Sequence, residues 1–162
     1  MNRLMKKIIA ATVMAFLVAG PAMATEDDAA SDIQAVRALF LRQAAGATAN
    51  DIHEMEAVFA VTPAGQPDPE SFVARAYRYW GREAVLAHFR RIFAGTWRFE
   101  PDEAAIQVTM LGKDVAQIYA PTRVTVGPPG QPATTSQFHM TEFAIRTSDG
   151  WRIATIVAVP AQ

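Results

Sequence analysis

The spacing of apolar residues changes from helical to strand-like after Thr96, and this change constrains the fold more than any other feature. Before Thr96, apolar residues recur every three or four positions, as on one face of an α-helix. After it, they alternate with polar residues, as in strands that bury one face. Helices followed by a run of hairpin-linked strands predict an α+β domain, in which a curved antiparallel sheet wraps around three helices.

Three long helices are expected in the first half of the chain. Apolar residues at helical spacing mark them over 32–45, 51–59 and 81–95. Ser31, followed three residues later by Gln34, forms a capping box that indicates where the first helix begins.

The stretch between the second and third helices is less regular. A short strand is expected at 60–62, and three prolines and a glycine then predict a loop over 63–69. Asp68, Pro69 and Glu70 are residues that favour the start of a helix, so the sequence predicts a further short helix over 70–79.

In the second half of the chain, apolar and polar residues alternate in five segments, which predicts strands at 97–99, 106–110, 115–126, 134–146 and 151–159. Turn-forming residues at 112–114 and 148–150 predict tight hairpins between neighbouring strands. A longer loop rich in proline and glycine is expected over 127–132.

The chain begins with a pattern typical of a secretory signal peptide. Three basic residues within the first seven precede an apolar run over 8–19, and Ala22 and Ala24 are small residues at the positions that a signal peptidase reads. The apolar run is shorter than the roughly 20 residues that span a membrane, although an uncleaved anchor is the alternative. We therefore expect cleavage after Ala24 and a periplasmic or secreted protein.

The predicted organisation is a signal peptide over 1–24, a flexible acidic leader over 25–30, and one domain over 31–162. Cleavage would leave 12 basic and 16 acidic residues, a net charge of −4, which disfavours nucleic acid and anionic membranes as partners. No later segment is apolar enough for stable membrane insertion. Because the chain has no cysteine, disulfides, thiolate chemistry and cysteine metal sites are excluded.

Four local patterns, in this order, resemble the superfamily of nuclear transport factor two, ketosteroid isomerase and the SnoaL-like polyketide cyclases. They are the apolar helix face over 33–40, Asn50-Asp51, Gly81-Arg82-Glu83-Ala84-Val85 and Asp149-Gly150-Trp151-Arg152-Ile153. The resemblance implies a cone-shaped, cystatin-like roll with an apolar pocket at its open end. It also implies frequent homodimers through the sheet, and functions that range from isomerase, cyclase or dehydratase to no chemistry at all.

The resemblance to ketosteroid isomerases implies three site positions, of which the chain fills one. A catalytic base is expected at the end of the first strand, near 61–63, where there is no acid, although Asp68 could approach from the loop. A tyrosine is expected near Phe40, and a late-strand acid at Glu142. The incomplete set leaves both a binding protein and an enzyme open.

Glu142 and His139 are the candidate acid–base residues. Alternation along a strand puts them on opposite faces, so they cannot both point into the pocket without a bulge. A buried Glu142 would have a raised pKa, whereas an outward-facing Glu142 would be solvated or paired with Arg123. His139 could move protons near neutral pH or serve as an ordinary core or rim residue.

Aromatic and polar residues near the expected pocket entrance are the candidate ligand-binding residues, namely Tyr79, Trp80, His88, Trp97, Tyr119 and Arg123. The aromatic members could form a lid over a flat apolar ligand or close the core. His88 could frame the pocket mouth or cover apolar surface at the edge of a helix. Tyr119 and Arg123 could orient a ligand or lie on an outer, dimer-forming face.

Two functions remain open from the sequence. The first is binding of a small apolar or aromatic molecule, or a role as a dimeric interaction module. The second is cofactor-free proton transfer on a carbonyl-bearing or polycyclic substrate. No cofactor is expected, because phosphate-binding, haem and flavin motifs are missing from the sequence. No metal is expected, because the three histidines are widely spaced.

Overall fold

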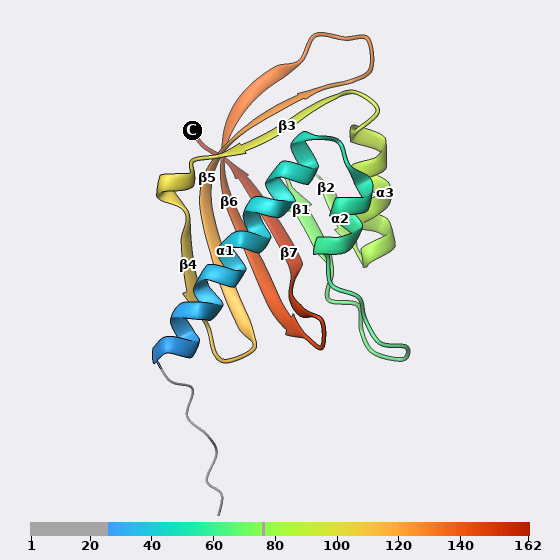
Figure 1. Cartoon of the computed structure of the whole chain (residues 1–162). Coiled ribbons are helices and arrows are strands. Elements are labelled where there is room, and N and C mark those ends of the chain that lie inside the picture. The colour runs from blue at the N-terminus through green and yellow to red at the C-terminus, as the bar shows by residue number, and fades with distance from the viewer. Residues whose placement is uncertain (1–25, 76) are drawn as a thin grey trace, which may run out of the picture.

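The computed structural model describes residues 26–75 and 77–162, which form helices packed on one curved sheet (Figure 1). The helices are α1 (Glu26–Thr48), α2 (Ile52–Val58), α3 (Arg82–Ile92) and the 3₁₀ turn η1 (Glu103–Ala105). The predicted signal peptide and its cleavage site lie outside the described residues, so export stays a prediction. None of the described helices is long and apolar enough to cross a membrane.

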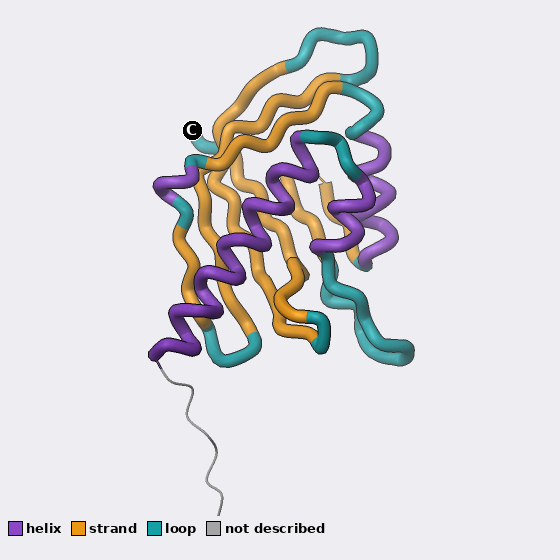
Figure 2. The backbone as a smooth tube through the Cα atoms, in the orientation of Figure 1, coloured by secondary structure: helices purple, strands orange, loops and turns teal. Residues whose placement is uncertain are grey.

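Seven strands form a single sheet. They are β1 (Ser71–Ala74), β2 (Tyr77–Trp80), β3 (Thr96–Pro101), β4 (Gln107–Met110), β5 (Val115–Gly127), β6 (Thr134–Thr147) and β7 (Gly150–Pro160). Their order is β2-β1-β7-β6-β5-β3, and β4 also pairs with β5. Figure 2 shows the strands as one continuous curved layer behind α1. This is the expected α+β cone, except that the sheet is mixed, because β1 pairs with β7 in parallel.

The predicted helix over 70–79 is wrong, because this segment forms the β1–β2 hairpin. Ser71 to Ala74 pair with Thr155 to Ala158 of β7, and this non-local pairing outweighs the local helix-start signal. Asp68 nevertheless contacts the start of a helix from the preceding loop, although the N-cap residue of α3 is Gly81. One of its carboxylate oxygens accepts from the Arg82 N–H at 2.7 Å, at the start of α3, and the other accepts from the Glu70 N–H at 2.9 Å.

Two boundaries also differ from the expectation. The first helix begins at Glu26 and so includes most of the segment expected to be a leader, where alanine and acidic residues favour the start of a helix. The strand expected at 60–62 reduces to a single bridge between Phe59 and Ile153. Prolines follow directly, and a proline has no N–H to extend a ladder.

The core fills the space between the helices and the concave face of the sheet. Its fully buried side chains include Val36, Phe40, Met55, Val58, Phe59, Leu86, Ile118, Ile153 and Ile156. α1 lies diagonally across the sheet and contacts β3, β4, β5 and β7, while α3 contacts β1 and β2 (Figure 1). The helices therefore cover one face of the sheet, and its other face carries the alternating exposed residues of the long strands.

Candidate functional site

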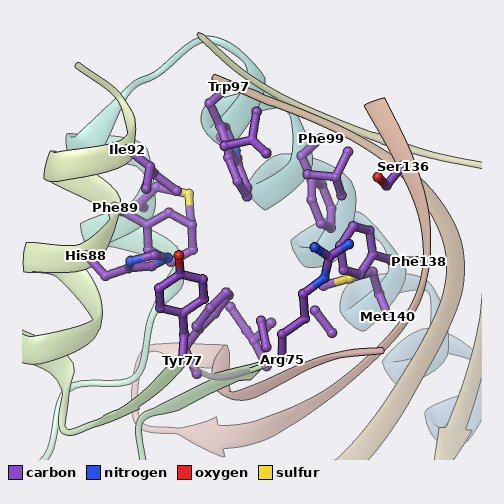
Figure 3. A pocket seen from close by; sticks show the side chains of 18 of the residues that line it. Arg75, Tyr77, His88, Phe89, Ile92, Trp97, Phe99, Ser136, Phe138 and Met140 are labelled. Carbon is purple, nitrogen blue, oxygen red and sulfur yellow. The ribbon is translucent and has the colours of Figure 1, made fainter. Parts of the chain in front are cut away.

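A cavity of about 290 Å³ lies between the concave face of the sheet, the C-terminal half of α1, and α3 (Figure 3). Six aromatic side chains line it, namely Phe72, Tyr77, Phe89, Trp97, Phe99 and Phe138. Three small residues, Ala47, Ala74 and Ala158, also line the wall. A small side chain leaves space that a larger one would fill, so large rings beside alanines keep the hollow open.

One polar group in the cavity wall is an amide that is hydrogen-bonded to a buried acid. Gln43 lines the cavity from α1, and its Nε2 donates to Oε1 of Glu142 on β6 at 3.1 Å. Glu142 is fully buried, and burial raises its pKa to about 8, although the bond from Gln43 acts in the opposite direction. Its carboxyl group is therefore largely neutral at pH 7. Oε1 of Gln43 and Oε2 of Glu142 are buried without a hydrogen-bond partner among the described residues.

A second buried acid, Glu70, stands at the start of β1. Burial raises its pKa to about 9, and repulsion from Asp68 and Glu142 acts in the same direction. The nearby Ala60 N–H donates to the carbonyl of Ile153 at 2.8 Å, which leaves both oxygens of Glu70 without a partner among the described residues. The chain thus keeps two neutral carboxylic acids beneath the cavity.

His88 lines the cavity from α3 as a neutral ring. Burial, reinforced by the adjacent positive charge of Arg91, lowers its pKa to about 4. Arg91 lies 3.2 Å from Nδ1 of His88, and because a guanidinium only donates, Nδ1 accepts and the ring proton is on Nε2. Arg91 also donates to the Tyr79 hydroxyl at 2.8 Å, and Tyr79 stacks on His88 with ring centroids 4.5 Å apart. His88 and Arg91 therefore form one side of the cavity, with Tyr79 behind them.

The structure brings only some of the predicted site residues to the cavity. Trp97 and His88 line it, and the indole N–H of Trp97 is buried without a partner among the described residues. Tyr79 supports the wall through Arg91, whereas Trp80 is 70% exposed and does not line the cavity.

Three predicted residues lie on the outer face of the sheet instead. The Tyr119 hydroxyl is 2.9 Å from Nδ1 of His139, and Arg123 pairs with Glu100 at 3.2 Å. Glu142 is buried while His139 is exposed, as strand alternation predicts. The homodimer that the family resemblance implies would use this outer face, and it stays a prediction.

Sequence reasoning missed Gln43, Glu70, Arg75 and Arg91 as site residues. Gln43 continues the spacing of Val36 and Phe40 on α1, so a polar residue in an apolar helix face was the available signal. Glu70 and Arg75 flank β1, the first strand of a hairpin that local signals did not predict. Among the described residues, no three His, Asp or Glu side chains lie close enough together to hold a metal ion.

A family model described as a SnoaL-like domain matches residues 36–160. No curated protein matches the chain. Solved structures do match, among them a candidate dehydratase of the NTF2-like family from Streptomyces avermitilis. Its TM-score is 0.68 at 21% identity, over 82% of this chain and 97% of that one.

Two structures from Novosphingobium aromaticivorans are also similar. A candidate scytalone dehydratase has a TM-score of 0.71 at 10% identity, over 85% of this chain and 89% of that one. A candidate aromatic ring hydroxylase has a TM-score of 0.70 at 17% identity, over 82% of this chain and 91% of that one. At these identities the likeness shows the shared fold.

Proposed function

The chain belongs to the SnoaL-like domain family, and from this premise we propose that its exported, mature domain binds a small, mainly apolar molecule in the cavity. One observation carries the proposal, namely a partly open hollow that aromatic rings line beside the packed core. A ligand that fills it gains packing contacts with these rings.

The size and lining of the cavity limit the ligand. Its volume of about 290 Å³ is at the low end for ligand pockets, which favours a body of one or two rings. The aromatic rings of the wall favour a flat aromatic body.

Blocking the cavity tests this proposal. Ser136 lines the cavity from β6 (Figure 3), whereas the neighbouring Gln137 is exposed and does not line it. Ser136→Phe should abolish binding of one- and two-ring aromatic compounds in a calorimetric or thermal-shift panel, and Gln137→Phe should leave it unchanged. Equal affinities in wild type and Ser136→Phe, with both variants folded, would contradict binding in the cavity.

A second candidate function is proton transfer by Glu142. The supporting observation is a neutral, fully buried acid that contacts a cavity-lining side chain. Glu142 itself does not line the cavity, so Gln43 would have to move aside before a substrate could reach the carboxyl group. Binding is therefore the better-supported function.

Deuterium exchange would detect the second function. If Glu142 transfers protons, the protein should accelerate deuterium incorporation next to the carbonyl of a bicyclic ketone such as 2-tetralone, and Glu142→Gln should lose the acceleration. The surface variant Glu103→Gln, in which the altered carboxyl group is exposed, is the matched control. Equal rates with and without protein would contradict catalysis on this substrate class while leaving binding intact.

A further inference from the structure

Two arginines line the cavity without a carboxylate partner. Arg75 stands in the turn between β1 and β2, and Arg91 stands near the end of α3. Figure 3 shows the Arg75 side chain rising from the turn beside Phe138, and its Cζ lies 5.4 Å from the centre of that ring. Within residues 26–75 and 77–162, the polar and ring contacts of Arg91 are with two neutral groups, Tyr79 and His88. Among the described residues, neither guanidinium has an ion pair.

Two arginines that do not line the cavity pair with carboxylates, whereas Arg78 and Arg98 have no ion pair among the described residues. Arg90, next to Arg91 in sequence, contacts Glu56 and Glu83, each at 2.8 Å. Arg123, on the outer face of the sheet, pairs with Glu100. Three exposed or half-buried acids, Glu56, Glu83 and Glu100, are thus paired with arginines outside the cavity.

The other ionisable groups around the cavity do not offset the two charges. No Asp or Glu is among the described residues that line it, and His88 is neutral. Glu142, which contacts the cavity-lining Gln43, is largely protonated at pH 7. The cavity therefore carries two positive charges next to an apolar interior, and a concave site lined by charge of one sign attracts ions of the opposite sign.

The backbone at Arg75 is a second, independent indication. Its φ is 52°, a left-handed conformation that glycine or asparagine adopts at lower cost than a long side chain does. At the other left-handed non-glycine position, the chain has Asn50. Strained positions that persist cluster at functional sites, and a strained turn that presents an unpaired guanidinium to a cavity fits that pattern.

We infer that the ligand is an amphipathic anion, with an apolar body in the cavity and a carboxylate that pairs with one of its two lining arginines, Arg75 or Arg91. This inference rests on the proposed binding function and names the chemical class of its ligand. The planar guanidinium fork matches a carboxylate through two parallel hydrogen bonds, and bonds between charged partners are the stronger kind. A neutral ligand of the same shape would leave both guanidiniums without a carboxylate partner.

Matched pairs of probes test the charge requirement. The probes are one- and two-ring carboxylates, such as naphthalene-2-carboxylate, and the corresponding neutral amides, with affinities measured by calorimetry at low salt. The wild type should bind each carboxylate at least about tenfold more tightly than its amide. Arg75→Asn, which suits the left-handed turn, should remove most of this preference, and adding Arg91→Gln should abolish it.

Arg78→Gln is the matched control, because it removes a positive charge from the same hairpin at an exposed position that does not line the cavity. It should keep the preference for carboxylates. Equal binding of carboxylates and amides by the wild type would overturn the anion assignment and leave the binding function standing. A preference that persists in the folded double variant would overturn it too. If no probe of either series binds, the binding function and the inference both fail.

Discussion

The arginines at the two ends of β6 differ in whether they pair with a carboxylate. Near its C-terminal end, Arg146 contacts Asp32 and Asp114, and its guanidinium lies 4.5 Å from the centre of the Trp151 ring. Near its N-terminal end, the Phe138 ring is the partner of Arg75, with no carboxylate among the described residues. We call these regions the paired end (Asp32, Asp114, Arg146 and Trp151) and the cavity end (Gln43, Arg75, Arg91 and Phe138).

The difference separates groups that hold the fold from groups that are available to a ligand. At the paired end, Asp32 also accepts from the Trp151 indole at 3.2 Å, so α1, β6 and β7 are joined through one carboxylate. At the cavity end, polar atoms of Gln43 and Trp97 are buried without partners. An unsatisfied buried polar group costs stability, and the paired end avoids this cost.

The largest expected effect concerns the two neutral acids, Glu70 and Glu142, beneath the cavity end. Their folded pKa values, about 9 and 8, lie above the usual value of 4.5, so the folded protein keeps protons that the unfolded chain loses. The contribution of these two groups to the free energy of unfolding should therefore be largest below pH 4.5 and should fall between pH 4.5 and 9. For each group, the free energy of unfolding should decrease by up to about 1.4 kcal/mol per pH unit.

Urea unfolding between pH 5 and 9 measures this slope. The double variant Glu70→Gln with Glu142→Gln should be much less sensitive to pH over this range, while Glu103→Gln should follow the wild type. An equally steep fall in the double variant would show that other groups cause it.

A smaller effect is expected at the paired end. Arg146→Met removes the ion pair that lowers the pKa of Asp32, and we expect a loss of about 1 kcal/mol at neutral pH. The lowered pKa means that this stabilisation is present above the usual pKa of 3.8 and disappears as the pH falls through the folded value. The loss should therefore shrink in acid.

Thermal unfolding of Arg146→Met at pH 7 and pH 3 checks this prediction. Lys113→Met is the control, since it removes a pair whose lysine side chain is 85% exposed, and its effect should be close to zero. Ligand affinity should be unchanged in both variants. A loss of ligand binding in Arg146→Met would show that the paired end also contributes to binding.

The smallest expected effect is a gain in stability at the cavity end. Arg75→Asn relieves a left-handed backbone without breaking an ion pair, so we expect a gain of about 0.5 kcal/mol. The opposite change at the other left-handed position, Asn50→Arg, should lower stability by a similar amount. The denaturant midpoints of both variants test these two expectations. A clear destabilisation by Arg75→Asn would show that Arg75 stabilises the fold rather than being available to a ligand.

The sequence predicted the parts of the fold that depend on local pattern. Strand alternation alone separates Glu142 from His139, and the spacing of apolar residues identifies the three helices α1, α2 and α3. The β1–β2 hairpin was not predictable in this way, since it forms by pairing with β7, which lies about 80 residues further along the chain. Glu70 and Arg75 flank β1, so their roles were hidden with it.

The cavity depends on which side chains meet across the sheet, and no local pattern encodes this. Trp97 and Trp80 are both tryptophans near predicted element boundaries, yet one lines the cavity and the other is mostly exposed. Gln43 and Glu142 are 99 residues apart, and their contact follows from the packing of α1 on β6.

The indole signals of the three tryptophans give the most direct test of ligand binding in the cavity. Trp97 lines the cavity, Trp151 belongs to the paired end and Trp80 is exposed, so each reports on a different region in a proton–nitrogen NMR spectrum. Adding naphthalene-2-carboxylate should shift the Trp97 indole signal in a saturable way and leave that of Trp151 in place. A saturable shift confined to Trp151 or Trp80, or no saturable shift at all, would contradict the account.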